Sequence, residues 1–510
     1  TNQKAVLHPV GSDQEKGKTE VFSKPTVSYT IPGGELPTIP EGGTSKSKTA
    51  EQLDENFKSQ VALSLPSAEE QLVSDVVLVL DKSTSTGLKE QALEMLQNLK
   101  KEVQEKGAKV KVGVVLFNKE AHTDGFMDLE TQYEAIEAAI CQEIKSGTNL
   151  HAGILAGKLM LDHDTGVADE RKTLVVVSDG ITYMFNENPT AVAWGFMADS
   201  PKHFAGPDNW KSKYGNNQAP TDWNAWLTGI GARLSEQKDT HDYPYGTEPD
   251  ASLITPVEEA GNYVNSIDKA LYLSYEAYAQ AASEGYHCYA MPITPPGTAS
   301  NYEWGMSFMR YLANGKQVSF DSIENDILYA VDKGSVVKDY MGYVKEDYNF
   351  DFEHLDQLTV GGKALSMYQE GNTWYFGDGE PGPQNYRFKV VYDAGNKAET
   401  EMFTWYIEEP VSNFAPVQLT YTVKLINPKT ADGTYGKYDR DGSQHYEGLY
   451  TNQEAVLYPV DSRGNEYRPE EFPKPTVSYV VEHGSQEPGP DPNPTPNPGN
   501  NGGGSHGGHG

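Results

Sequence analysis

From residue 75 to about residue 345, short runs of apolar residues alternate with longer segments in which apolar residues recur every three or four positions. The runs VVLVL, KVGVVLF, TLVVVS and HCYAMPI predict four buried strands. After the first of them, residues 88–103 show helical spacing, and residues 322–342 predict the last helix of this region. Strands that alternate with helices predict a doubly wound, Rossmann-like α/β domain with a mostly parallel sheet over residues 75–345.

Beyond residue 346 the pattern changes to short alternating strands separated by turn residues, as in GNTWYFGDG, YRFKVVYDAG, FTWYIEE and LTYTVKL. This spacing predicts a β-sandwich of the immunoglobulin-like or Cna-like kind over residues 346–482. The final tract, residues 483–510, is rich first in Pro and then in Gly. Because such a composition cannot build a core, we expect a linker or stalk.

An internal repeat adds to this organisation. Residues 1–30 align without gaps on residues 451–480, and seventeen of the thirty positions are identical. Each copy begins and ends with a strand-like segment. Because the second copy closes the sandwich region, we expect residues 1–34 to be the C-terminal tail of a preceding β domain, followed by a Gly/Pro-rich linker over residues 35–47.

The charge balance limits the possible partners. The chain has 510 residues, with 41 Lys and Arg against 73 Asp and Glu, for a formal net charge of −32. This charge excludes a nucleic acid partner and disfavours an anionic membrane surface. No apolar run is long enough to span a bilayer, so no membrane insertion is expected. The two cysteines cannot form a disulfide framework, and the start without Met or a secretory leader indicates a mature product or a fragment.

Candidate chemistry gathers where the predicted strands end. The first strand leads into Asp81-Lys82-Ser83-Thr84-Ser85, a D-x-S-x-S loop. Thr148 lies in a Gly-containing loop before a helix, and Asp179 follows the strand TLVVVS. Ligand-binding loops gather at this edge of a doubly wound sheet. Two carboxylates and three hydroxyls suit a hard divalent cation, Mg²⁺ first and Mn²⁺ or Ca²⁺ as alternatives, and they do not suit zinc or copper.

These residues resemble the three-part adhesion motif of the von Willebrand factor A family, with Asp81, Ser83, Ser85, Thr148 and Asp179 in the family's order. The resemblance implies a metal-ion-dependent adhesion site in which the two serines hold the ion directly and Thr148 and the two aspartates hold it directly or through water. A carboxylate of the protein ligand would complete the coordination. Thr84 departs from the glycine that is common there. Such a Ser-rich turn alone can also simply cap a helix.

The sequence favours binding over catalysis at this place. It contains no G-x-S-x-G, H-E-x-x-H or Walker motif, and no base or nucleophile accompanies the candidate ligands. His151 follows Thr148 at the start of a helix, where packing or capping is the expected role. We therefore expect no enzyme. A hydrolase that uses the ion as a Lewis acid is the enzymatic alternative.

A long insertion separates Asp179 from the strand HCYAMPI, over about residues 183–285. It carries four of the seven tryptophans, and it leaves from the strand that bears a candidate ligand. One hypothesis is an arm that shapes the ligand surface, since rigid aromatic side chains are favoured binding anchors. The alternative is that the tryptophans form a core of their own: Trp194, Trp210, Trp223 and Trp226.

Outside the A-type region, the chain resembles pilus-tip adhesins of Gram-positive bacteria, in which an A domain is inserted into an immunoglobulin-like domain. That resemblance assigns residues 48–74 to the first strands of the sandwich. It also implies an amide cross-link between Asn452, in the motif Thr451-Asn452-Gln453, and a lysine. Lys48 is the preferred partner, and Lys424 is the local alternative. Both lysines can equally be surface residues, with Asn452 in a turn.

Together these features predict an extracellular adhesin on the cell wall or pilus of a Gram-positive bacterium. Its partner would be a host, matrix or cell-surface protein that supplies a carboxylate to the ion, and pilus or cell-wall proteins are further expected partners. The alternative is a structural pilin or stalk module that binds no ligand directly.

Overall fold

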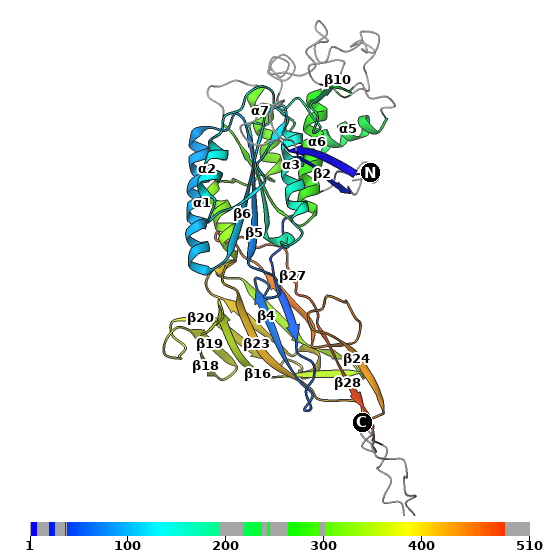
Figure 1. Ribbon diagram of the computed structural model, residues 1–510. Coiled ribbons are helices and arrows are strands. Elements are labelled where there is room, and N and C mark those ends of the chain that lie inside the picture. Colours follow the sequence, from blue (N-terminus) through cyan, green and yellow to red (C-terminus); the bar gives the residue numbers. More distant parts are fainter. Residues whose placement is uncertain are drawn as a thin grey trace, which may run out of the picture. The chain divides into compact units, whose positions relative to one another are not determined.

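The computed structural model divides into two compact units, each described separately below. The first contains Thr1–Ser45 and Glu70–Tyr329, and the second contains Lys46–Glu69 and Ala330–Gly510. Figure 1 shows the chain coloured along its sequence. The structure describes residues 2–7, 20–25, 36, 38–192, 218–236, 242–244, 264, 266–294 and 301–484, with the backbone alone at 2–7, 20–25, 191–192, 243–244 and 301–302.

The first unit is built on a sheet with the strand order β12-β9-β5-β6-β7, and β8 also pairs with β6. The central pairs β12–β9, β9–β5 and β5–β6 are parallel, whereas β7 and β8 run antiparallel to β6. The central strands are almost entirely buried because apolar residues occupy both faces. The strands are β5 (Val73–Asp81), β6 (Lys109–Phe117), β7 (Ala121–His122), β8 (Phe126–Asp128), β9 (Lys172–Ser178) and β12 (His287–Pro292).

Helices cover both faces of this sheet, with α1 and α2 on one side and α3 and α6 on the other (Figure 1). The predicted doubly wound α/β fold is therefore confirmed. Helix α1 begins at an N-cap, Ser85, and ends at Gly107, whose φ of 73° is favourable for glycine. The helices are α1 (Thr86–Lys106), α2 (Tyr133–Cys141), α3 (Leu150–His163), η2 (Asp169–Arg171), α5 (Trp223–Glu236), α6 (Ser266–Ser283), α7 (Asn301–Leu312) and α8 (Phe320–Leu328).

The last predicted helix of this region is wrong beyond Leu328. Helix α8 ends there, and the chain continues into β13 (Tyr329–Val331) and β14 (Val336–Met341). In β14 buried and half-buried residues alternate, which is the strand period. The α/β unit accordingly ends at Tyr329, and residues 330–345 lie in the second unit. None of the described helices is long and apolar enough to cross a membrane.

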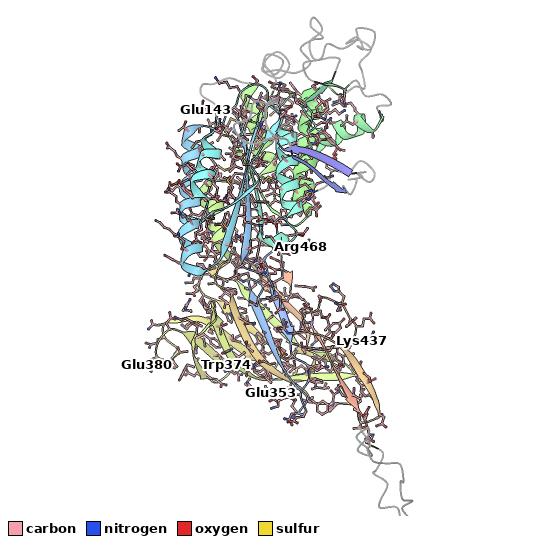
Figure 2. All side chains as sticks on the ribbon, in the orientation of Figure 1. Glu143, Glu353, Trp374, Glu380, Lys437 and Arg468 are labelled. Atoms are coloured by element: carbon pink, nitrogen blue, oxygen red, sulfur yellow. The ribbon has the colours of Figure 1, made fainter. Side chains whose placement is uncertain are left out.

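The second unit is a β-sandwich, as predicted. One sheet has the order β18-β19-β20-β21-β14-β26-β27, and the other has β15-β16-β23-β4-β3 with β17 beside β16. Their inward side chains form one aromatic-rich core that includes Trp374, labelled in Figure 2. The strands are β3 (Ser47–Ala50), β4 (Lys58–Leu65), β15 (Tyr343–Val344), β16 (Tyr348–Val360), β17 (Lys363–Ala364), β18 (Ser366–Glu370), β19 (Thr373–Gly377), β20 (Tyr386–Asp393), β21 (Met402–Ile407), β23 (Val417–Leu425), β26 (Asn452–Tyr458) and β27 (Glu470–Glu471).

Smaller elements complete this unit. The strand β22 pairs with β13, and β28 pairs with β24 and β25 in a three-stranded sheet. The short helix α9 precedes β21. Their bounds are β22 (Val411–Ser412), β24 (Gly433–Asp439), β25 (Leu449–Tyr450), β28 (Thr476–Val481) and α9 (Lys397–Thr400).

The two copies of the sequence repeat form the same strand pairing. In the first copy, β1 (Asn2–Leu7) pairs antiparallel with β2 (Glu20–Pro25), and Leu7 lies opposite Glu20. In the second copy, β26 pairs with β27, and Leu457 lies opposite Glu470, which are the aligned positions. The repeat is thus structural as well as sequential. Assignment of the first copy to a preceding domain stays a prediction.

Candidate functional site

The candidate metal site is the group Asp81, Ser83, Ser85, Thr148 and Asp179. Asp81 ends β5 and is 2% exposed. Its Oδ1 accepts hydrogen bonds from the backbone N of Ser83 at 3.0 Å and from Ser83 Oγ at 2.9 Å. The loop thereby turns back over the strand end, and Ser85 Oγ accepts from Leu88 N at 3.2 Å as the N-cap of α1. Helix capping is thus one role of this loop, and it leaves the second lone pair of Ser85 Oγ available.

Asp179 follows the adjacent parallel strand β9. Ser83 Oγ lies 3.4 Å from Asp179 Oδ2, so this hydroxyl stands between the two carboxylates. Ser178 Oγ donates to Asp81 Oδ2 at 2.7 Å and accepts from Gly180 N at 3.0 Å. These contacts orient both carboxylates from the strand ends that carry them.

Thr148 comes from a third element, the loop before α3, and is 5% exposed. Its backbone carbonyl accepts from Thr182 Oγ1 at 3.2 Å, which joins this loop to the segment after Asp179. Asn149 caps α3 by accepting from Ala152 N at 3.0 Å. The Thr148 hydroxyl accepts from Lys82 Nζ at 2.8 Å, so the ammonium of the motif's second residue lies beside a candidate ligand.

The electrostatics of the site favour a bound cation. Burial, and next the charge of Asp81, raise the pKa of the Asp179 carboxyl to about 7, although hydrogen bonds and Lys82 act in the other direction. Two nearby carboxylates with few neighbouring cations repel each other, and a divalent ion between them removes that repulsion. Among the described residues, no group of three or more His, Cys, Asp and Glu side chains could hold a metal. The candidate set differs from such groups because hydroxyls supply most of its oxygens.

His151 takes the structural role expected of it. It is 5% exposed, and its Nδ1 accepts from the backbone N of Asn186 at 2.9 Å. Burial lowers the pKa of His151 to about 3, so the ring is a neutral acceptor that holds the chain after Asp179.

Sequence reasoning missed two contributors, Ser178 and Lys82. Ser178 is the last residue of a buried strand, and its position directly before Asp179 was a usable signal. Lys82 contacts Thr148, which lies 66 residues further along the chain, and no local pattern in the sequence predicts that contact.

Of the four tryptophans in the insertion, Trp194 and Trp210 lie outside the described residues. Trp223 of α5 is 6% exposed and packs edge-on against Trp304 at 5.8 Å and Phe308 at 5.5 Å. Trp226 is half-buried and lies edge-on to the rings of Trp223 and Trp304. These two side chains belong to the core of the α/β unit, while a role of the arm at the ligand surface stays a hypothesis.

A second polar cluster lies within the sandwich core. Lys48 Nζ lies 2.7 Å from Asp339 Oδ2, and both side chains are fully buried. The Tyr421 hydroxyl donates to the same carboxylate oxygen, and Lys48 Nζ lies 5.6 Å from the centre of the Tyr421 ring. Asn452 is fully buried on β26, next to β14, which bears Asp339. Neither side-chain amide atom of Asn452 has a hydrogen-bond partner in the described structure.

Burial sets the protonation of this cluster. It lowers the pKa of the Lys48 amine and raises the pKa of the Asp339 carboxyl. Both shifts favour the neutral forms. The alternative partner Lys424 alternates with the buried residues Val423 and Leu425 on β23, and its side chain is half-exposed.

Residues 76–181 match the family model of the von Willebrand factor type A domain. The chain therefore contains a von Willebrand factor type A domain, and the doubly wound sheet and the candidate metal site both lie in the unit that includes it. No curated relative matches the sequence.

Several solved structures are similar to the chain at low identity. The three N-terminal domains of the type V pili tip protein Mfa5 from Porphyromonas gingivalis are 15% identical, over 87% of this chain and 79% of that one, with a TM-score of 0.28. The pilus adhesin SpaC from Lactobacillus rhamnosus GG is 15% identical, with 93% and 53% covered and a TM-score of 0.30. The pilus adhesin RrgA from Streptococcus pneumoniae is 12% identical, with 94% and 70% covered and a TM-score of 0.27. The chain thus spans about half the length of SpaC.

Proposed function

We propose that this protein is a metal-dependent adhesin of the bacterial cell surface, and that it binds a protein ligand through the candidate metal site. The observation that carries the proposal is the position of the Ser83 hydroxyl, 2.9 Å from Asp81 Oδ1 and 3.4 Å from Asp179 Oδ2. Oxygens from the loops after two adjacent strands, β5 and β9, lie together there. Hard oxygen ligands with two carboxylates suit Mg²⁺, or else Mn²⁺ or Ca²⁺.

Each residue has a distinct part in this proposal. Ser83 and Ser85 would supply hydroxyl oxygens, Thr148 a third, and Asp81 and Asp179 the negative charge. The ion supplies an open coordination position for a carboxylate of the ligand. Ser178 Oγ holds the Asp81 carboxylate, and the backbone N of Ile181 holds the Asp179 carboxylate by donating to its Oδ1 at 2.9 Å. The resulting complex requires no bond to be made or broken, which is why we propose binding and not catalysis.

The proposal is tested by calorimetric titration of Mg²⁺ and Mn²⁺ into chelator-treated protein. We expect saturable binding that both Ser83→Ala and Asp179→Ala abolish. Ser283→Ala is the matched control, because its exposed hydroxyl bonds only to the carbonyl of Gln280 at the end of α6. If the wild-type protein takes up no ion, or if both variants bind it normally, the metal site is not where we place it.

Adhesion itself is tested on cells. We propose an extracellular location, on the cell wall or pilus of a Gram-positive bacterium, and a host, matrix or neighbouring-cell protein as the partner. Purified protein should bind host cells or matrix in the presence of Mg²⁺, and chelator or Asp81→Ala should remove that binding. Binding that survives both treatments would contradict metal-dependent adhesion.

The buried cluster in the sandwich favours a second role, that of a covalently reinforced structural module. We propose that Lys48 and Asn452 form an amide cross-link. The neutral Lys48 amine would attack the Asn452 carboxamide carbon, the bond from that carbon to Nδ2 would break, and ammonia would leave. Protonated Asp339 would polarise the carbonyl and carry the proton from the amine to the leaving group.

Mass spectrometry of the intact chain tests the cross-link. We expect the wild-type protein to lack the mass of one ammonia, and Asp339→Asn and Lys48→Ala to regain it. Lys424→Ala should retain the deficit, because that side chain lies outside the core. A deficit lost only in Lys424→Ala would assign the cross-link to the other lysine.

A further inference from the structure

Helix α7 approaches the candidate metal site backbone to backbone. Gly180, which follows Asp179, has a φ of 73°. A Cβ atom on Gly305 of α7 would lie 2.1 Å from the carbonyl oxygen of Asp179, and one on Gly180 would lie 2.2 Å from the carbonyl oxygen of Gly305. Both distances are far shorter than any real contact of a Cβ atom. The atom approached in each case is a backbone oxygen, which cannot move aside as a flexible side chain can. The two glycines therefore permit an approach that no other residue type allows.

The same turn of α7 is attached to the insertion. Trp304, the neighbour of Gly305, lies edge-on to Trp223 and Trp226 of α5, with ring centres 5.8 Å apart in each case. Trp223 Nε1 donates to Ser307 Oγ at 2.9 Å. Helix α5 thus rests on the part of α7 that contacts Asp179.

We infer that α7 is a positioning element that couples the ion to the insertion: Gly305 holds the Asp179 backbone, and Trp304 and Ser307 hold α5. The inference deepens the proposed function and rests on it. Close-packed backbone has no room to absorb a small displacement, so a change at Asp179 is transmitted to α7. Ion binding fixes Asp179, and through α7 it restricts the motion of α5.

A glycine pair supplies the main experiment. Gly305→Ala adds one methyl group in a helix against the Asp179 carbonyl, whereas Gly229→Ala adds the same group in α5, where nothing lies within 4 Å. We expect Gly305→Ala to weaken Mg²⁺ binding by about tenfold or more, the effect typical of losing a residue that orients a metal ligand. Gly229→Ala should bind Mg²⁺ as the wild type does.

Hydrogen exchange reports the coupling itself. In the full-length wild type, saturating Mg²⁺ should slow amide exchange in α5 and α7 and leave β19 and β20 of the sandwich unchanged. Ser307→Ala removes the hydrogen bond to Trp223 without adding bulk. It should keep the fold of the wild type and still bind Mg²⁺, but lose most of the Mg²⁺-induced protection of α5.

The outcomes separate the inference from the proposed function. If the wild type binds no Mg²⁺, the proposed function fails. If the wild type binds Mg²⁺ and Gly305→Ala binds it equally well, or if α5 gains no protection, only the inference is overturned. Should Gly305→Ala fail to fold by circular dichroism, the Ser307→Ala exchange result decides.

Discussion

Lys82 illustrates how much one side chain can change the candidate metal site. Its ammonium donates to Thr148 Oγ1 at 2.8 Å, and its charge lowers the pKa of Asp179 against the larger effect of burial. In the absence of a metal ion, this cation partly offsets the negative charge of the Asp179 carboxylate. It therefore competes with a divalent ion for the same oxygens.

Lys82→Met should accordingly bind Mg²⁺ more tightly, by about fivefold for a half-exposed pair worth about 1 kcal/mol. The metal-free variant should also melt at a lower temperature, because repulsion between Asp81 and Asp179 is no longer offset. Calorimetry and thermal unfolding with and without Mg²⁺ measure both effects. A weaker affinity would instead show that Lys82 supports the ion.

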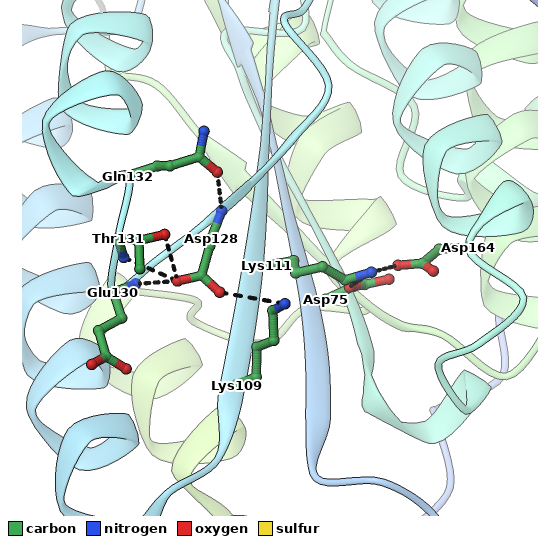
Figure 3. A network of polar contacts seen from close by, with 8 residues as sticks. All are labelled: Asp75, Lys109, Lys111, Asp128, Glu130, Thr131, Gln132 and Asp164. Carbon is green, nitrogen blue, oxygen red and sulfur yellow. Dashed lines mark hydrogen bonds and ion pairs between the residues drawn. The ribbon is translucent and has the colours of Figure 1, made fainter.

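Asp75 is a buried carboxyl at the opposite end of β5 from Asp81. Figure 3 shows it beside Lys111, whose Nζ lies 3.8 Å from Asp75 Oδ1 and also pairs with Asp164. Burial, and then the neighbouring Asp164, raise the pKa of Asp75 to about 8, against the opposing charges of Lys111 and Lys172. The native protein therefore keeps a proton on Asp75 that the unfolded chain loses near pH 4.

This difference makes Asp75 a cause of alkaline destabilisation. Between about pH 4 and pH 8 the native state holds the extra proton, so the stability contributed by Asp75 is full below pH 4 and is lost as the pH rises. Asp75→Asn should melt about 2–4 °C above the wild type at pH 8.5, equivalent to about 1 kcal/mol, and close to it at pH 4. Equal melting temperatures at both pH values would show that Asp75 is ionised in the native state.

Asp128, in the same figure, provides a control of opposite sign. Burial acts to raise its pKa, but hydrogen bonds from Thr131 and Glu130 together with Lys109 outweigh that effect and lower it. The stability that Asp128 contributes to the folded protein is present above the usual Asp pKa of 3.8 and is lost as the pH falls. Asp128→Asn should therefore destabilise the protein at pH 7, and the difference should close toward acid pH.

At the scale of elements, α3 shows why glycines occur inside a helix. A Cβ atom on Gly157 would lie 2.7 Å from a methyl group of Val79 and 2.9 Å from one of Leu174, so the helix packs directly on β5 and β9. Gly157→Ala should lower stability by about 1–3 kcal/mol through overpacking. Gly229→Ala in α5 should raise it by about 0.5–1 kcal/mol, because there only helix propensity changes. Denaturant unfolding measures both, and a stabilising Gly157→Ala would disprove the close packing.

The elements also show how far the sequence could be interpreted. The buried strands and α1 were predictable, because apolar runs and helical spacing act locally. The end of α8 was not. Residues 322–342 contain apolar residues at both the helical and the strand period. The strand β14 forms because β21 and β26 pair with it on either side. Those partners are more than sixty residues away, so their effect is invisible in a local pattern.

For the candidate sites, the sequence named the candidate metal ligands but not the residues that support them. Motif order named Asp81 and Asp179, because a loop after a parallel strand always meets its neighbours at one edge of the sheet. It could not name Asp339 as the acid of the proposed cross-link. That residue lies in a segment predicted as helix, and its burial beside Lys48 depends on the facing of two sheets.

At the scale of the whole molecule, we expect Mg²⁺ to stabilise the α/β unit and the proposed cross-link to stabilise the sandwich. Mg²⁺ binds only the native α/β unit under our proposal, so it should raise the melting temperature of that unit by mass action and leave the sandwich unchanged. Two resolved calorimetric transitions, of which only one moves with Mg²⁺, would support this. If both transitions move together, the units unfold as one.

The cross-link should act on the other transition. A bond from Lys48 to Asn452 joins β3 to β26, which lie in opposite sheets of the sandwich and are separated in sequence by Glu70–Tyr329 of the α/β unit. Unfolding of the α/β unit then cannot release β3 from the sandwich. By analogy with other covalent loop closures, Asp339→Asn should cost the sandwich about 4–5 kcal/mol, and its transition should move down while the Mg²⁺-dependent shift of the first transition is kept. Lys424→Ala should change neither, and a sandwich transition unmoved in Asp339→Asn, in a protein that has regained the mass of ammonia, would show that the bond does not stabilise the fold.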